Sequence, residues 1–193
     1  MRIIAGLLKN RRILSPKSTL TRPTSEKLRE TLFNICQTYI KDTDFLDLFA
    51  GSGAMGIEAL SRGARMVTFV DAERESIRCI RKNLEDLKIT ESCTIISSDV
   101  FEGIKKLLKA KDRYDIIFAD PPYDAFSHYR GEKISFSECV VRMLDESDLL
   151  KQGGMLFIED SADSQPVVDK LQSLELISSR RLGRSALQQY QKK

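Results

Sequence analysis

The tetrapeptide Asp120-Pro121-Pro122-Tyr123 combines groups that could activate the exocyclic amine of a nucleobase. Such an amine is a poor nucleophile because its lone pair is delocalised into the ring. Two acceptors fixed on its N–H bonds, the Asp120 carboxylate and a carbonyl of the proline pair, would free that lone pair. The prolines lock φ and remove backbone donors, so the loop presents carbonyls. Tyr123 could stack on a base flipped out of its helix. We therefore predict catalytic roles for Asp120, Pro121 and Tyr123; the alternative is an ordinary turn after a strand.

A glycine-rich segment, Gly51-Ser52-Gly53-Ala54-Met55-Gly56, matches the G-x-G-x-x-G pattern, and Asp71 lies 20 residues after Gly51. Glycines at this spacing permit a tight turn and close approach of a ligand to the backbone, and an acid at the end of the next strand binds ribose hydroxyls. NAD and S-adenosylmethionine both suit this geometry. A dehydrogenase usually needs a second domain, for which 193 residues leave little room. We therefore favour S-adenosylmethionine; a glycine turn needed only for packing is the remaining alternative.

Both motifs follow apolar segments, and the pattern around them alternates between strands and helices. This alternation indicates an α/β fold with a mostly parallel sheet and helices on both faces, which binds ligands beyond the carboxyl ends of its strands. The predicted strands are 45–49, 66–70, 94–97, 114–119 and 155–159, with a closing hairpin of 176–179 and 186–190. The predicted helices are 55–62, 73–87, 136–144 and 167–174, a short one ending at Leu108, and one starting at Thr24 or Ser25. Residues 2–14 are predicted to form a small hairpin.

We divide the chain into an N-terminal basic extension, residues 1–40, and a catalytic domain, residues 41–193. Hydrophobic residues make up 41% of the chain, as in globular proteins, and no apolar run approaches the length of a membrane span. The N-terminus has no signal-peptide pattern, so we expect a cytoplasmic protein with no membrane partner. The four cysteines form no Cys-x-x-Cys pair and His128 is the only histidine, so we expect no metal site and no Ser-His-Asp triad. Our default expectation is a monomer.

Positive charge is concentrated near the N-terminus. Residues 1–30 hold eight basic and two acidic side chains, whereas the whole chain has a net charge of only +3. This asymmetry suggests that a polyanion docks on the N-terminal segment; the alternative is solvated terminal charge. The residues predicted to make these contacts are Arg2, Lys9, Arg11, Arg12 and Arg22.

At these motifs the chain resembles class I S-adenosylmethionine-dependent amino-methyltransferases, and more closely the RsmD family of bacterial 16S rRNA guanine-N2 methyltransferases. The narrower resemblance rests on Met1–Gly6, Arg22-Pro23-Thr24, Phe45–Gly53, Glu58–Ala64 and Asp120–Tyr123. It implies a Rossmann-like fold with a mostly parallel seven-stranded sheet. Asp71 departs from the family pattern, in which glutamate is expected in many members.

The resemblance also implies which residues bind the cofactor. Asp47 would lie under its methionine end, Asp71 would hold the ribose, and Asp99 with the backbone beside Val100 would hold the adenine. Two of these residues have local alternatives, because Asp47 could bond loop amides and Asp99 could cap the following helix. The full predicted set is Asp47, Phe49, Gly51, Ser52, Gly53, Asp71, Asp99 and Val100.

We therefore predict that the chain transfers a methyl group from S-adenosylmethionine to the N2 amine of one guanine in 16S rRNA, within the small ribosomal subunit or its assembly intermediate. A DNA adenine-N6 or cytosine-N4 methyltransferase is the nearest rival; it would share the Asp-Pro-Pro-Tyr motif but normally carries a target-recognition region. Two further rivals are a nucleotide-binding module or dehydrogenase, and a non-catalytic RNA-binding scaffold.

Overall fold

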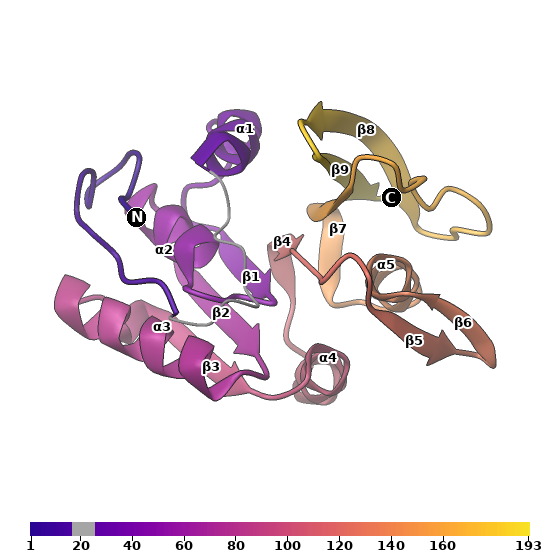
Figure 1. Ribbon diagram of the computed structural model, residues 1–193, viewed down its shortest axis with the longest axis horizontal. Coiled ribbons are helices and arrows are strands. Elements are labelled where there is room, and N and C mark those ends of the chain that lie inside the picture. The colour runs from indigo at the N-terminus through magenta and orange to yellow at the C-terminus, as the bar shows by residue number, and fades with distance from the viewer. Residues whose placement is uncertain (17–25) are drawn as a thin grey trace. The chain divides into compact units, whose positions relative to one another are not determined.

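The computed structural model describes residues 1–16 and 26–193, and the chain forms two compact units, Met1–Gly103 and Ile104–Lys193 (Figure 1). The predicted helix start at Thr24 or Ser25 and the predicted phosphate contact Arg22 lie outside the described residues. The predicted division of the chain after residue 40 is not tested by these units and stays a prediction.

The first unit contains three parallel strands flanked by helices. β1 (Asp44–Leu48), β2 (Met66–Asp71) and β3 (Cys93–Ser97) pair in parallel, with β2 in the middle. α2 (Ala54–Ser61) packs on β1 and β2, α3 (Arg74–Leu87) packs on β3, and α1 (Glu26–Cys36) contacts α2. The 3-10 turn η1 (Thr90–Ser92) leads into β3, and α4 (Val100–Ala110) begins in this unit. Because the strands run in one direction, the loops that follow them lie at one edge.

The second unit begins inside α4 and contains the other four strands of the main sheet. β4 (Tyr114–Ala119) pairs in parallel with β7 (Leu150–Ser161), β9 (Ser185–Lys192) pairs antiparallel with β7, and β8 (Leu174–Leu182) pairs antiparallel with β9. A separate hairpin of β5 (Phe126–Tyr129) and β6 (Glu132–Ser135) leads into α5 (Phe136–Asp145), which packs on β5, β6 and β7.

These elements confirm the predicted fold class, an α/β fold with a mostly parallel seven-stranded sheet. The apolar runs predict the strands well because both faces of a parallel sheet are covered, so successive residues are all buried. Phe45–Leu48 and Ile116–Ala119 are buried without interruption, and β4 has the predicted bounds. None of the helices in the described part of the chain is long and apolar enough to cross a membrane.

One predicted helix is wrong. The segment 167–174 has helical spacing of apolar residues, but it is irregular and its last residue begins β8. Its backbone amides are used elsewhere: the Asp145 carboxylate accepts hydrogen bonds from the amides of Gln172, Ser173 and Leu174 at 2.7–2.8 Å. Lys170 has a φ of 61°, which a right-handed helix does not permit. The hairpin β5–β6 is a second difference, because no strand is predicted between residues 119 and 136.

The N-terminal segment forms a reduced version of the predicted hairpin. A single antiparallel bridge joins Arg2 and Arg12, and the amide of Ile3 donates to the carbonyl of Arg11 at 3.0 Å. Most of the hydrogen bonds that hold this segment are made with α2 and α3 rather than across the hairpin.

Candidate active site

The glycine loop between β1 and α2 is a tight turn built from left-handed residues. Phe49, Gly51 and Gly53 have φ values of 57°, 55° and 76°, and the amide of Gly53 donates to the carbonyl of Ala50 at 2.7 Å. A non-glycine residue at positive φ is strained by about 1–2 kcal/mol, and such strain tends to occur at functional sites. The half-exposed Phe49 is such a residue.

Two carboxylates, those of Asp47 and Asp71, accept hydrogen bonds from backbone amides in and beside this loop. Asp47 is buried, and its Oδ2 accepts from the amide of Gly56 in the first turn of α2 at 2.9 Å. Burial raises the pKa of Asp47 well above its ordinary value; the Gly56 amide opposes this rise and the charge of Asp71 adds to it. Asp71 accepts from the amide of Gly51 through Oδ2 and from that of Glu73 through Oδ1, each at 2.8 Å. Asp71 therefore links the glycine loop to the start of α3.

The space around the glycines shows where a ligand would fit. A Cβ on Gly56 would lie 2.3 Å from Phe69, so this glycine is needed for packing, whereas a Cβ on Gly53 would make only a tight contact with the side chain of Ile80, at 3.2 Å. A Cβ on Gly51 would meet nothing nearer than the carbonyl oxygen of Phe49 at 4.0 Å. The loop thus has open space at Gly51, beside Asp71, and this fits the predicted approach of a nucleoside cofactor to the backbone.

Asn83 of α3 also holds the glycine loop, and sequence reasoning missed it. Its Nδ2 donates to the carbonyl of Ser52 at 3.0 Å and to that of Leu14 at 3.1 Å, and its Oδ1 accepts from the amide of Leu14 at 2.7 Å. The side chain is buried. The available signal was a polar residue on the apolar face of α3, beside Ile80 and Leu84.

Asp99 caps α4, which is the alternative role that the sequence suggested for this residue. Its Oδ1 accepts from the amides of Phe101 at 2.9 Å and Glu102 at 3.3 Å, and Val100 is buried at the start of the helix. Asp99 is exposed. Capping leaves its predicted contact with adenine as a prediction.

The Asp120-Pro121-Pro122-Tyr123 motif follows β4 in the second unit. The Tyr123 hydroxyl donates to Oε1 of Glu159 on β7 at 3.1 Å, and Glu159 is buried. Burial raises the pKa of Tyr123, and the negative charges of Glu159 and Asp120 raise it further. The hydroxyl therefore stays protonated and tethers the ring. The amide of Ala125 donates to the carbonyl of Pro122 at 3.2 Å, which closes a turn after the motif.

Glu159 was not predicted as a site residue. It lies within a strand that the sequence did predict, but 36 residues separate it from Tyr123, so the sequence around the motif gives no local signal for it. Glu159 reaches the motif because β4 and β7 pair in parallel. The register places Ala119, the last residue of β4, opposite Ile158, and Glu159 is the next residue of β7.

The basic N-terminal residues lie on a segment that is bound to α2. We call the hydrogen bonds from Glu58 and Ser61 of α2 to the backbone of Ile4–Leu8 the N-terminal latch. Glu58 is buried and accepts from the amides of Ile4 at 2.8 Å and Ala5 at 3.0 Å. The carbonyl of Ser61 accepts from the Leu7 amide at 2.7 Å, and its Oγ accepts from the Leu8 amide at 3.0 Å and donates to the Ala5 carbonyl at 2.5 Å.

Glu58 also binds two arginines. The buried Arg29 of α1 lies 3.4 Å from Oε2, and Nε of Arg62 lies 2.9 Å from Oε1. The latch joins the motifs Met1–Gly6 and Glu58–Ala64, because the first supplies the backbone groups that Glu58 and Ser61 of the second bind. The exposed members of the predicted polyanion set on this segment are Arg2, Lys9, Arg11 and Arg12.

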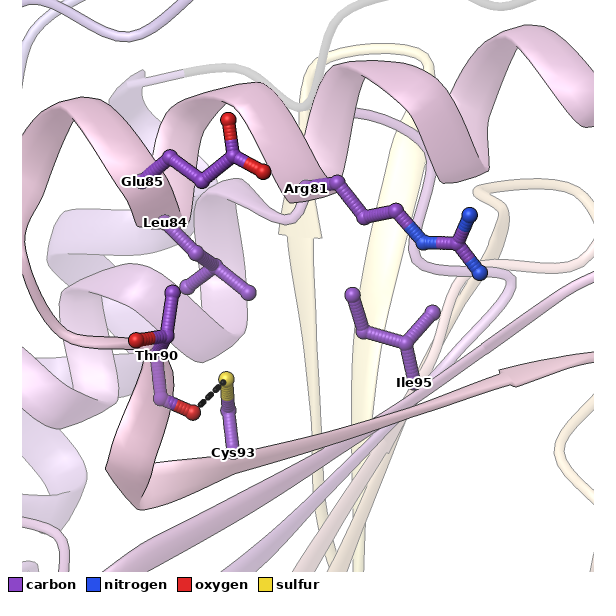
Figure 2. A pocket seen from close by; sticks show the side chains of 6 residues that line it. All are labelled: Arg81, Leu84, Glu85, Thr90, Cys93 and Ile95. Carbon is purple, nitrogen blue, oxygen red and sulfur yellow. Dashed lines mark hydrogen bonds between the residues drawn. The ribbon is translucent and has the colours of Figure 1, made fainter.

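A pocket of about 210 Å³ lies between α3 and β3. Figure 2 shows Arg81 and Glu85 of α3 on one side of it and Cys93 and Ile95 of β3 on the other. It contains none of the predicted site residues and lies toward the amino end of β3, whereas ligands of such sheets bind beyond the carboxyl ends. The candidate site is therefore the glycine loop with its carboxylates, and not this pocket.

Comparison with known proteins places this arrangement in a family. The model of the family described as Conserved hypothetical protein 95 matches residues 1–191. The chain belongs to this family, the RsmD family. The Ribosomal RNA small subunit methyltransferase D of Haemophilus influenzae is 34% identical over 84% of this chain and 80% of its own length. Its namesake in Escherichia coli is 32% identical over 85% of this chain and 76% of its own length.

A solved structure extends the similarity to the whole chain. The Escherichia coli protein yhhF matches this RsmD-family protein with a TM-score of 0.82 and 30% identity, over 100% of this chain and 98% of that chain. These comparisons confirm the predicted family, the predicted fold class and the prediction that the chain is a methyltransferase. The predicted cofactor, S-adenosylmethionine, agrees with the methyltransferase names of these relatives.

Proposed function

We propose that this RsmD-family protein transfers a methyl group from S-adenosylmethionine to the N2 amine of a guanine in 16S rRNA of the small ribosomal subunit or its assembly intermediate. The observation that carries the proposal is the Asp120–Tyr123 motif at the end of β4, with the Tyr123 ring tethered through Glu159. Relatives named Ribosomal RNA small subunit methyltransferase D support the class of substrate. We also propose that the protein is cytoplasmic and monomeric.

The first unit would bind the cofactor, which when bound supplies a methyl group on a positively charged sulfur. The loop of Phe49, Gly51, Ser52 and Gly53 would contact it through the backbone, with the buried Asp47 beneath. Asp71 would accept from ribose hydroxyls: each of its oxygens already accepts one amide, and a carboxylate has about four lone-pair sites, which leaves room for more bonds. Asp99 and Val100 would lie beside the adenine.

The second unit would activate the amine. Asp120 would accept one N–H of the guanine amine, and the second acceptor would be the carbonyl of Pro121, because the carbonyl of Pro122 closes the turn with Ala125. Drawing both N–H bonds toward acceptors frees the lone pair for direct displacement, without a covalent enzyme intermediate. The Asp120 carboxylate need not be a strong base, since the amine proton becomes acidic once the methyl group has transferred. Tyr123 would stack on the flipped guanine.

The N-terminal segment would bind RNA phosphates. Arg2, Lys9, Arg11 and Arg12 are exposed, and the latch fixes the backbone that bears them. Arg22 belongs to the same proposed set on sequence grounds alone. Contacts of this kind release counterions, so affinity should fall steeply as salt rises.

The test is incorporation of labelled methyl groups from S-adenosylmethionine into small ribosomal subunits taken from cells that lack this protein, with duplex DNA as the competing substrate. The expected product is labelled 16S rRNA, and Asp120→Asn is the matched control because it keeps size and removes the carboxylate. Label in DNA would favour an adenine-N6 or cytosine-N4 methyltransferase. Calorimetric titration with NAD and with S-adenosylmethionine separates the proposal from a dehydrogenase.

A further inference from the structure

The hairpin β5–β6 presents a mixed aromatic and basic face that the proposed reaction has not used. Residues that pair across an antiparallel ladder share a face, and the register pairs Phe126 with Ser135 and His128 with Lys133. The opposite face, with Ile134 buried, packs against α5 (Figure 1). The first face is therefore the outer one, and Phe126 on it is 55% exposed.

Two features distinguish this face from an ordinary solvated hairpin. The ammonium of Lys133 lies 5.0 Å from the centroid of the Phe126 ring, so a cation and an exposed aromatic ring form one unit. Among the described residues, no carboxylate forms an ion pair with Lys133, whereas Arg130 at the tip is held by Glu146 at 2.7 Å. The outer face bears no carboxylate, because Glu132 pairs with Tyr129 on the other side of the ladder.

The hairpin is fixed to the amine-binding motif at its base. The amide of Ala125 donates to the carbonyl of Pro122, and the carbonyl of Ala125 accepts from the amide of Phe136 at the start of α5 at 3.0 Å. The tip is a two-residue turn in which Arg130 and Gly131 have φ values of 51° and 87°, the conformation that suits a tight hairpin. The outer face is thus held by a short and defined connection.

Phe126 follows Tyr123 by three residues, which span at most about 10 Å of extended chain. Successive nucleotides of a stacked strand are about 3.4 Å apart along its axis, so a nucleotide close to the methylated guanine would come within reach of the ring. An exposed ring beside a cation matches what proteins use to bind single-stranded RNA, in which bases stack on aromatic side chains and cations bind the phosphates.

We propose that the outer face of the β5–β6 hairpin, Phe126, His128 and Lys133, binds an unpaired nucleotide that flanks the target guanine, with the base stacked on Phe126 and its phosphate near Lys133. This inference rests on the proposed function, since it names a second contact for the same RNA substrate. This face fits a protein partner less well than a nucleotide, because Phe126 is its single apolar side chain and the other residues of the face are polar.

The test measures binding to small ribosomal subunits from cells that lack this protein, with methyl incorporation by the wild-type protein as the first step. Phe126→Leu keeps an exposed apolar side chain and removes the stacking surface, so affinity for the subunits should fall about 5- to 150-fold. Phe126→Trp should retain wild-type affinity. Lys133→Gln should weaken binding and reduce the salt slope by about 1. Affinity for S-adenosylhomocysteine should not change in any of these variants.

Ile177→Ala is the matched control, because Ile177 is an exposed apolar residue of the same unit, 47% exposed on β8. It should bind the subunits like wild type. Wild-type affinity in Phe126→Leu would overturn the inference, as would an equal loss in Ile177→Ala. If Phe126→Ala lowered affinity for the subunits while Phe126→Leu kept it, the contact would be apolar packing against a protein, and this result would also overturn the inference. If the wild-type protein methylates no rRNA in the first step, the proposed function fails instead.

Discussion

Substituting Gly6 by alanine should break the N-terminal latch. Gly6 has a φ of 83°, and a Cβ at this position would lie 1.8 Å from the carbonyl oxygen of Ser61. No rotamer can relieve a contact between a Cβ and a backbone oxygen, so the segment must move away from α2. The three hydrogen bonds that Ser61 makes with Ala5, Leu7 and Leu8 would then break.

The size of the effect follows from these interactions. Left-handed backbone costs a non-glycine residue about 1–2 kcal/mol, and each broken hydrogen bond contributes about 0.5–1.5 kcal/mol, which together give a loss of about 2.5–6.5 kcal/mol in the free energy of unfolding. Gly183→Ala is the matched control: Gly183 has a φ of 79°, but its Cβ would meet nothing within 4 Å. This variant should lose only the backbone part, about 1–2 kcal/mol.

Equilibrium denaturation in urea measures both variants, and limited digestion with trypsin reports the segment directly, because Lys9, Arg11 and Arg12 are cleavage sites within it. Gly6→Ala should be cleaved there faster than Gly183→Ala, and it should bind small ribosomal subunits more weakly. If the two variants are destabilised equally and cleaved at the same rate, the latch does not hold the segment as described.

The remaining predictions concern the proposed site. Asp120→Ala should lower kcat by about 10²–10³ while S-adenosylhomocysteine affinity in calorimetry stays near wild type, because Asp120 would contact the amine and not the cofactor; retained turnover would contradict its role. Asp71→Ala should weaken that affinity, since each hydrogen bond to a charged acceptor is worth about 1.5–3 kcal/mol, and Gly51→Val should weaken it by filling the open space at the loop; unchanged affinity in both would place the cofactor elsewhere. Replacing Arg11 and Arg12 by alanine should weaken binding to the subunits and lower the salt slope by about 1 for each phosphate that is no longer bound, while an unchanged slope would indicate solvated charge.

The fold could be predicted from the sequence where one local signal decided each element. The strand Tyr114–Ala119 is an uninterrupted apolar run, and its bounds in the structure are those predicted. The helix predicted over 167–174 fails because Asp145, far away in sequence, takes the amides of residues 172–174. The hairpin β5–β6 was missed because its strands are four residues each and its turn is Arg130-Gly131 rather than the usual Asn-Gly.

The site residues, too, could be predicted only where the signal is local in the sequence. The glycine loop and Asp71 could be found because the motif and the spacing are contained in one strand–helix–strand unit. Asn83, Glu58 and Glu159 could not, since each acts by bonding a segment 31 or more residues away: Asn83 to Ser52, Glu58 to Ile4 and Glu159 to Tyr123. The polar side chain of Asn83 on an otherwise apolar helix face was a local signal, but by itself it does not say which segment the side chain bonds.

The most direct test of the central claim is mass mapping of methylated guanosine in 16S rRNA from cells with and without this protein. The proposal predicts N2-methylguanosine at one position in cells that contain the protein, its absence in cells that lack it, and its return when the wild-type protein but not Asp120→Ala is supplied. An identical methylguanosine pattern in both kinds of cell would contradict the proposed function.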